Sequence, residues 1–363
     1  MKILMLNYEF PPIGGGSANA TNQVLNELAK YDDVEIDLVT SSKGKYQVEK
    51  FSKNITIYKL NINKKNPHFF STKEIFLWSF RTLFFLPKLF KKKNYDVCHC
   101  WSGWPPGFFG FFFENNQNFL IGLRGTDVPG FNPRMGILDK IIFKPYSKIV
   151  WGRAVKVIAN SQGLKELAQK TWKGDIEIIY NGIDTTEFKP GKKVIKKNKI
   201  ITVCRLIERK GLKYLISSLK NLDVELDIIG EGPELSNLKK LAKDLNVKVN
   251  FLGYVNHKDL PKHYQNATLF VLPSFYEGMS NSILEAMACG LPIITTGTGG
   301  SKELIKRNGI IIKQKSEKSI RKAITTIINN NLSKKMSKES REIALRLSWS
   351  NVAKQYIEIY KQI

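Results

Sequence analysis

The chain has 363 residues, a formal net charge of +25 and a hydrophobic fraction of 42%. This hydrophobic fraction is sufficient for buried cores, and the length favours two domains. A strongly basic protein favours polyanions such as nucleic acid, anionic membranes or phosphorylated substrates. We find no helix-turn-helix motif, zinc-finger spacing or aromatic RNA-binding motif, so nucleic acid is not expected as a partner.

The four cysteines predict a reduced, cytoplasmic protein. Cys98, Cys100 and Cys204 lie in apolar strand candidates and Cys289 ends a helix candidate, where Cys packs as a small apolar residue. Cys98 and Cys100 point the same way on one strand, but no second pair completes a zinc site, and no metal is expected. The N-terminal apolar run is too short for a signal peptide, and we expect no transmembrane span.

The chain begins with a unit that is typical of phosphate-binding folds. Lys2–Asn7 is an almost wholly apolar run, as expected for a buried parallel strand. A loop with Gly14, Gly15 and Gly16 follows, and then a helix candidate from Ala18 to Lys30. A strand, glycine loop and helix can cradle a diphosphate, so Gly15 and Gly16 are candidate binding residues. A flexible turn without a ligand is the alternative.

Strand and helix candidates then alternate through the first half of the chain, which predicts a parallel, doubly wound sheet. The further strand candidates of this half are Val34–Ser41, Ile55–Leu60, Asp96–Cys100, Phe119–Arg124, Val155–Asn160 and Ile176–Tyr180.

The helix candidate Thr72–Lys91 is rich in Phe. Phe76, Phe80, Leu83 and Phe84 share one face, while Arg81, Lys88 and Lys91–Lys93 supply positive charge. Pro87 should end or kink this helix. A basic, Phe-rich amphipathic helix can lie in a membrane interface, and a helix packed on its own sheet is the alternative.

A second alternating series follows the polar run Lys189–Asn198, which cannot build a core. Its strand candidates are Lys199–Leu206, Val224–Gly230, Val247–Gly253, Leu269–Leu272, Pro292–Thr296 and Gly309–Lys313, and its helices are expected to begin near Lys210, Pro233, Asn256, Gly278 and Ser301. The chain therefore contains two Rossmann-like domains in series, and the cleft between two such domains is the expected site.

The stretch Pro273–Gly290 contains two carboxylates, Glu277 and Glu285, eight positions apart. A helix beginning near Gly278 would place Glu285 on the face below Glu277. The free backbone N–H groups of Gly278, Met279 and Ser280 would then bind an anion. Carboxylates accept hydrogen bonds from sugar and ribose hydroxyls, so the stretch indicates a nucleotide sugar. Solvated acids on a helix are the alternative.

This stretch resembles the signature of the retaining glycosyltransferases of family 4, in which a Pro-Ser turn precedes Glu, seven residues and Glu. The resemblance covers nearly the whole chain, through the motifs YEFPP-GGG, NGID, RLIERKG, GEGP and FLGYV. It implies the GT-B fold, with two Rossmann-like domains facing across a cleft. Residues 1–182 would bind the acceptor, residues 183–345 would bind the nucleotide sugar, and a helix over 346–363 would cross back to the first domain.

The resemblance also implies roles for particular residues. Arg205 and Lys210 would bind the donor diphosphate and stabilise the leaving group, although Cys204 stands where the family has glycine. Glu277 would hold the donor sugar's hydroxyls and Glu285 the ribose. In the family the loops of Gly230 and Gly232 and of Tyr254 and Val255 border the nucleotide base. Tyr254 as a merely packed aromatic residue is the alternative.

One position departs from the family. Many members have His-Gly in a loop after a central strand, where the His contacts the donor sugar, whereas here Arg124 precedes Gly125. Arg124 and Asp127 are therefore candidates for contacting donor or acceptor. His99 is the nearest histidine candidate, and a structural role is its alternative.

These observations predict a retaining glycosyltransferase that moves a hexose from a nucleoside diphosphate sugar to a hydroxyl acceptor. No nucleophile stands out, and metal independence is expected because cations would stabilise the leaving diphosphate. The charge and the Phe-rich helix favour a lipid-linked or surface-polysaccharide acceptor, in lipopolysaccharide or capsule assembly, at the cytoplasmic membrane face. The alternatives are another GT-B reaction, such as sugar phosphorolysis or nucleotide-sugar epimerisation, and a non-catalytic protein that binds membranes or polyanions.

Overall fold

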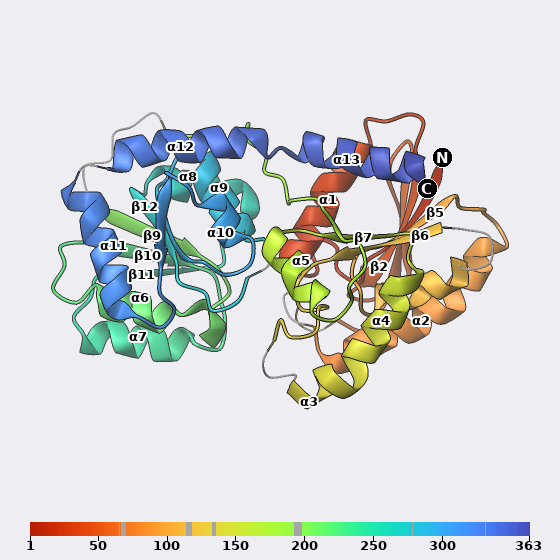
Figure 1. Cartoon of the computed structure of the whole chain (residues 1–363), viewed down its shortest axis with the longest axis horizontal. Helices are drawn as coiled ribbons and strands as arrows, with labels where there is room; N and C mark the ends of the chain where they lie inside the picture. Colours follow the sequence, from red (N-terminus) through yellow and green to blue (C-terminus); the bar gives the residue numbers. More distant parts are fainter. Residues whose placement is uncertain are drawn as a thin grey trace. The chain divides into compact units, whose positions relative to one another are not determined.

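The computed structural model describes residues 1–64, 66, 70–113, 118–132, 136–191, 198–277, 279–330 and 332–363. The chain forms two compact α/β units (Figure 1). Unit 1 comprises Met1–Asn181 and Trp349–Ile363, and unit 2 comprises Gly182–Ser348. The chain thus divides after Asn181 and after Ser348, where the sequence led us to expect divisions after residues 182 and 345.

Unit 1 is built on an eight-stranded sheet with the order β3-β4-β2-β1-β5-β6-β7-β8. The strands are β1 Lys2–Leu6, β2 Glu35–Ser42, β3 Gln47–Ser52, β4 Ile55–Asn61, β5 Val97–Cys100, β6 Asn118–Leu123, β7 Lys156–Ala159 and β8 Glu177–Ile178. Every neighbouring pair is parallel except β3 and β4, so the predicted parallel sheet is confirmed. The sequence did not predict β3, because this edge strand has no buried face and therefore no alternating apolar pattern.

The helices of unit 1 include a long, capped helix α2. They are α1 Gly16–Leu28, α2 Thr72–Phe90, the 3-10 turn η1 Pro106–Phe113, α3 Gly136–Leu138, the π-turn η3 Asp139–Phe143, α4 Lys144–Arg153, α5 Gln162–Gln169 and α13 Trp349–Gln362. Ser71 and Glu74 form a capping box at the start of α2. Of the two predicted effects of Pro87, an end of the helix is not observed, since α2 continues to Phe90. Pro87 lies in the last turn, so only three residues of the helix follow the position where its missing N–H removes a hydrogen bond.

The C-terminal helix α13 belongs to unit 1, as predicted, and packs against α1. Its predicted apolar residues are all buried: Trp349, Val352, Ala353, Tyr356, Ile357 and Tyr360. They join a core that contains Ile3 and Met5 of β1 and Val24 and Leu25 of α1. The helix therefore completes the core of unit 1.

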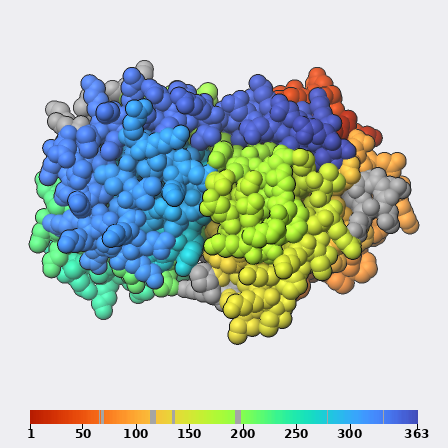
Figure 2. All heavy atoms as spheres, in the orientation of Figure 1, coloured from red at the N-terminus to blue at the C-terminus, as the bar shows by residue number. Residues whose placement is uncertain are grey.

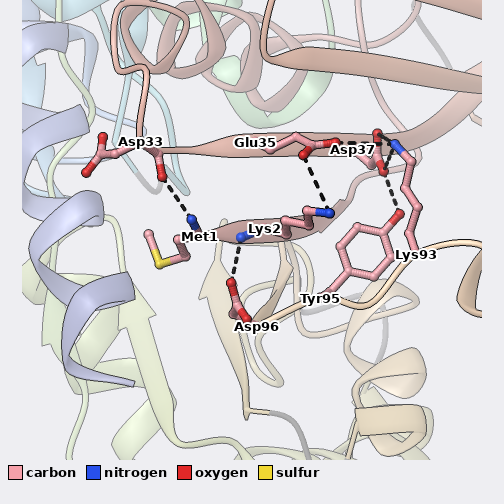
Figure 3. Close-up of polar contacts among 8 residues, drawn as sticks. All are labelled: Met1, Lys2, Asp33, Glu35, Asp37, Lys93, Tyr95 and Asp96. Atoms are coloured by element: carbon pink, nitrogen blue, oxygen red, sulfur yellow. Dashed lines mark hydrogen bonds and ion pairs between the residues drawn. The ribbon is translucent and has the colours of Figure 1, made fainter.

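A polar cluster holds the amino ends of β1 and β2 (Figure 3). The buried carboxylate of Asp37 accepts hydrogen bonds from the Lys93 ammonium at 2.8 Å and from the Tyr95 hydroxyl at 2.5 Å. Burial opposes the charged form of Lys93, yet the bond to Asp37 raises its pKa. The backbone N–H of Lys2 donates to Asp96 at 2.7 Å. This cluster lies at the end of the sheet opposite to the one where ligands of such folds bind.

Unit 2 is built on a six-stranded parallel sheet with the order β11-β10-β9-β12-β13-β14. Its strands are β9 Lys199–Val203, β10 Glu225–Ile229, β11 Val249–Gly253, β12 Leu269–Leu272, β13 Ile293–Thr296 and β14 Gly309–Ile312. Its helices are η4 Glu208–Lys210, α6 Leu212–Ser218, α7 Leu235–Asp244, η5 His257–Asp259, α8 Leu260–Gln265, α9 Asn281–Ala288, α10 Ser301–Leu304, α11 Glu317–Asn329 and α12 Ser333–Arg346. All six predicted strands are confirmed.

The helix predicted to begin near Gly278 is α9, which begins three residues later. Helix α9 begins at Asn281, with Ser280 as its extended N-cap residue, and Gly278 itself lies outside the described residues. Before the helix, the N–H of Phe275 is bonded to the carbonyl of Arg209 in the loop after β9. No helix in the described part of the chain is long and apolar enough to cross a membrane.

Candidate functional site

The sheet of unit 2 has its switch point between β9 and β12. From β9 the chain adds β10 and β11 on one side, and from β12 it adds β13 and β14 on the other. Ligands of open parallel sheets bind outside the carboxyl ends of the strands at such a point. Two loops leave from there, Cys204–Gly211 after β9 and Pro273–Ser280 before α9. These loops contain most of the site residues that the sequence predicts for unit 2.

The two loops are joined by backbone contacts. The N–H of Phe275 donates to the carbonyl of Arg209 at 2.7 Å, and the Arg209 guanidinium donates to the carbonyl of Tyr276 at 2.8 Å. Gly211 has a φ of +67°, and a Cβ placed there would lie 2.4 Å from the carbonyl oxygen of Pro273. Only glycine suits this position, and it lets the two loops pack as one rigid surface.

Lys210 and Glu277 form a buried ion pair on this surface. The Lys210 Nζ contacts the Glu277 Oε1, and their side chains are 10% and 9% exposed. Burial acts to raise the pKa of Glu277, but the charges of Lys210 and Arg209 lower it overall. Glu277 is therefore ionised at neutral pH, and it presents an acceptor for hydroxyl groups beside a cation.

Arg209 is a site residue that the sequence reasoning missed. It lies one position before Lys210 in the motif RLIERKG and is half-buried against Glu277, while Arg205 remains exposed. Burial lowers the pKa of Arg209, and the negative charge of Glu277 acts to raise it. The positive charge of Arg205 lowers it further. Two cations, Lys210 and Arg209, thus act on the Glu277 carboxylate, and Arg205 acts on Arg209. This excess of positive charge suits an anion such as a diphosphate.

Glu285 is held in a separate environment on α9. Its buried carboxylate accepts a hydrogen bond from the Tyr264 hydroxyl at 2.8 Å and lies 3.3 Å from the His257 Nε2. Burial acts to lower the pKa of His257, but the hydrogen bond and charge of Glu285 raise it. His257 and Tyr264 were also missed, because nothing in their spacing along the chain links them to Glu285. The two carboxylates therefore lie in different surroundings. Glu277 lies among cations, and Glu285 lies beside an imidazole and a phenol.

The glycines after β10 permit close approach to the loop after β9. Gly230 has a φ of +128°, and a Cβ there would lie 2.0 Å from the carbonyl oxygen of Cys204. A Cβ on Gly232 would lie 2.3 Å from the carbonyl oxygen of Leu206. These two predicted donor-binding glycines therefore shape the loop that carries Arg205.

The remaining candidates of unit 2 lie around the same edge of the sheet. Tyr254 follows β11 and is 56% exposed, and the next residue, Val255, is half-buried. Met279 and Ser280 are buried just before α9, and the Ser280 hydroxyl lies 3.2 Å from the hydroxyl of Ser282. The sequence predicted N–H donors at Gly278, Met279 and Ser280. Because α9 begins at Asn281, the N–H of Met279 belongs to the loop, whereas Ser280 directly precedes the helix.

In unit 1 the glycine loop follows β1, which lies beside β5 at the switch point of that sheet. Gly15 is the N-cap residue of α1, and Gly16 is the first residue of the helix. The N–H of Gly15 lies 3.4 Å from the Glu9 carboxylate, and a Cβ on Gly15 would meet no atom within 4 Å. The loop therefore has open space at Gly15, as a phosphate-binding loop requires.

His99 is fully buried beneath α13. Its Nδ1 lies 2.7 Å from the Tyr360 hydroxyl, and its ring packs against those of Trp101 and Tyr356. Burial lowers its pKa well below the usual value, and the charge of Arg124 acts in the same direction. This packing favours the structural role that the sequence left open for His99.

Arg124 and Asp127 also make contacts within unit 1. The Arg124 guanidinium stacks 3.9 Å from the Trp101 ring and donates to the Tyr356 hydroxyl at 2.9 Å. The Asp127 carboxylate accepts from the N–H groups of Gly103 at 2.7 Å, Arg124 at 3.0 Å and Gly125 at 2.8 Å. Burial raises the pKa of Asp127, and these N–H groups oppose the rise. Asp127 thus fixes the loop that presents Arg124.

The described residues contain no group of three or more His, Cys, Asp or Glu side chains that could hold a metal ion. All four cysteines are free, and Cys98 and Cys100 lie with their sulfurs 3.9 Å apart.

The chain has two α/β units whose sheets are built mainly of parallel strands, and the second unit carries cations and acids at the carboxyl edge of its sheet. These features are typical of the GT-B class of glycosyltransferases. The family model for glycosyl transferases group 1 matches residues 184–343, and the model for glycosyltransferase family 4 matches residues 14–187. The chain belongs to the group 1 glycosyltransferases of family 4, and it is a transferase that uses a nucleotide sugar.

Individual proteins agree with this assignment. The chain is 28% identical to an uncharacterised glycosyltransferase of Methanocaldococcus jannaschii, over 99% of this chain and 98% of that protein. Its fold is similar to sucrose-phosphate synthase from Thermosynechococcus elongatus, with a TM-score of 0.87, 20% identity and coverage of 100% and 98%. It is also similar to Anabaena HepE in complex with UDP and glucose, with a TM-score of 0.78, 19% identity and full coverage of both chains.

Proposed function

We propose that the protein is a retaining hexosyltransferase whose donor binds at the switch point of unit 2. The observation that carries this proposal is the Lys210–Glu277 pair, in which a cation and a carboxylate lie side by side in one buried surface. A nucleoside diphosphate sugar has its phosphate and its sugar hydroxyls equally close together. The ammonium has three N–H donors, so it can keep its contact with Glu277 and still bind a phosphate oxygen.

Each further residue has a part in this proposal. Glu277 holds hydroxyls of the donor sugar, and Glu285 holds the ribose. Arg205 and Arg209 bind the diphosphate with Lys210, and the N–H of Ser280 adds a donor at the start of α9. Together the cations stabilise the charge that develops on the leaving diphosphate, which is the task of a metal in other transferases. We therefore propose that turnover does not require a divalent metal.

For the acceptor we propose a hydroxyl of a lipid-linked or surface-polysaccharide glycan, at the cytoplasmic face of the membrane. The support is the net charge of +25, which attracts lipid-linked diphosphates and anionic membranes. Retention is proposed from the family resemblance alone, and no side chain is named as nucleophile.

The test is release of nucleoside diphosphate from a panel of UDP-, GDP- and ADP-sugars, with and without chelator. Lys210→Ala should lower turnover by about a hundredfold or more, because it removes a cation from the leaving diphosphate. Glu285→Ala should also lower turnover, because it removes the carboxylate that holds the ribose of the donor. Lys338→Ala is the matched control, since this lysine is 82% exposed on α12 and should leave turnover unchanged.

Two outcomes would contradict the proposal. Turnover that survives both substitutions would mean that the donor binds elsewhere. Turnover that requires inorganic phosphate and yields a sugar phosphate would favour the phosphorolysis alternative. The anomeric configuration of the product, determined by NMR, tests retention separately.

A further inference from the structure

Unit 1 carries most of the large hydrophobic side chains that are exposed among the described residues. They gather on α2, on η1 and on the segment from α3 to α4, and we call this set the apolar face. Its members are Phe76, Phe80, Leu83, Phe84, Phe108, Phe112, Ile137, Leu138, Ile141, Ile142 and Ile149. Exposed apolar surface on this scale marks an interaction site.

Ring contacts through Trp104 connect α2 with the segment from α3 to α4. On α2 the rings of Phe80 and Phe84 lie 4.8 Å apart. Phe76, one turn earlier, lies 6.4 Å from Trp104, and Trp104 lies 6.1 Å from Phe143 at the end of η3. The yellow segment from α3 to α4 stands out at the lower edge of the surface in Figure 2, where its isoleucines are exposed.

Basic residues are frequent on the segments that carry the apolar face. On these segments and directly after α2 they are Lys73, Arg81, Lys88, Lys91, Lys92, Lys140, Lys144, Lys148 and Arg153. The two acidic residues described on α2 and on the segment from α3 to α4 are both engaged. Glu74 is bonded to Lys64 and to the cap residue Ser71, and Asp139 accepts the N–H of Gly130 at 2.8 Å.

A groove of about 480 Å³ runs beside α2, within unit 1. Its lining combines the rings of Phe80 and Phe84 with the cations of Arg81 and Lys88. Tyr46, before β3, forms the opposite side. Apolar walls next to two cations suit an acyl chain whose head group is anionic.

We propose that the apolar face docks unit 1 on the surface of an anionic lipid bilayer. Its Phe and Ile side chains would enter the boundary between head groups and acyl chains, while the Lys and Arg side chains contact lipid phosphates. A protein partner fits less well, because lysine is depleted in protein–protein interfaces and abundant here. The proposal goes beyond the transfer reaction, since docking requires neither donor nor acceptor.

The test is cosedimentation of the full chain with vesicles of phosphatidylcholine alone and of phosphatidylcholine with phosphatidylglycerol, at low and high salt. Wild type should bind only the anionic vesicles, and high salt should weaken binding. Phe84→Gln and Ile141→Gln should each lower the partition coefficient about tenfold, because each removes one side chain from the bilayer. Lys88→Gln and Lys148→Gln should each lower it about fivefold.

The controls are Leu345→Gln, which removes an apolar side chain that is 50% exposed on α12, and Lys338→Gln. Both should bind as wild type does. Release of nucleoside diphosphate in solution should be unchanged in all variants, so loss of docking is distinguishable from loss of the donor site. The proposal is overturned if the wild-type protein does not bind anionic vesicles at low salt. It is also overturned if the face variants alter only self-association, measured by light scattering.

Discussion

The Lys210 ammonium is paired with the Glu277 carboxylate, although 67 positions separate the two residues in the chain. They meet because β9 and β12 are neighbours in the sheet, so the loops that follow these strands adjoin at its carboxyl edge. Both side chains are buried, and each charge therefore depends on the other.

Breaking this pair should destabilise the protein more than breaking a surface pair. Lys210→Met and Glu277→Gln should each cost about 3 kcal/mol, since each leaves the remaining charge buried without its partner. The double variant should recover part of that loss. The measurement is the midpoint of urea unfolding.

The exposed pair of Lys338 and Glu342 on α12 is the control, and its single variants should cost less than about 1 kcal/mol. Equal losses for the buried and the exposed pair would show that Lys210 and Glu277 do not depend on each other.

The sequence predicted the parallel sheets well, because their strands are continuous apolar runs with little ambiguity. The family resemblance also placed Lys210 and Glu277 in one site, and the two side chains are in contact in the structure. The start of α9 was predicted only to within three residues, because helix ends are the least certain part of a sequence pattern. Edge strand β3 was missed because an exposed strand has no apolar pattern.

The partners of Glu285 could not be predicted from the sequence. His257 and Tyr264 precede it by 28 and 21 positions and reach it only through the packing of η5 and α8 against α9. His99 was ambiguous for a similar reason. Its position at a strand end is compatible with a ligand site, and only the packing of α13 shows that it is buried.

Gly211→Ala should destabilise the protein much more than Gly253→Ala. Both glycines have a φ of +67°, so alanine at either position must adopt a left-handed backbone conformation, which costs about 1 kcal/mol. At Gly211 the new Cβ would also lie 2.4 Å from the Pro273 carbonyl oxygen, whereas at Gly253 it would meet nothing within 4 Å. We expect a further loss of at least about 1 kcal/mol at Gly211. Urea midpoints that are equal for the two variants would contradict the close approach of the two loops.

The contribution of His257 to stability should depend on pH. Its pKa in the folded protein is raised above 6.5, as burial is outweighed by Glu285 and by the charges of Glu187 and Asp184. The stabilisation is therefore fully present below pH 6.5 and is lost as pH rises through the folded pKa. His257→Gln should lower the thermal midpoint relative to wild type at pH 6, by a loss of about 1 kcal/mol or less given partial exposure, and have little effect at pH 9.

The matched control for this experiment is His263→Gln on α8. It removes an imidazole from the same unit and leaves the contact between His257 and Glu285 in place. A loss for His257→Gln that does not change between pH 6 and pH 9 would mean that the imidazole acts by packing against Phe188 rather than by charge.

Tyr360→Phe should destabilise unit 1 although it removes a single oxygen atom. The hydroxyl lies 2.7 Å from the Nδ1 of His99, and both residues are buried, so the variant leaves an imidazole nitrogen without its partner. We expect a loss of about 1–2 kcal/mol, measured by hydrogen exchange of the amides of β1 and β5. Tyr46→Phe is the control, because this tyrosine is 51% exposed and should cost nothing measurable. If Tyr360→Phe leaves the exchange of β1 and β5 unchanged, the bond between Tyr360 and His99 adds no stability.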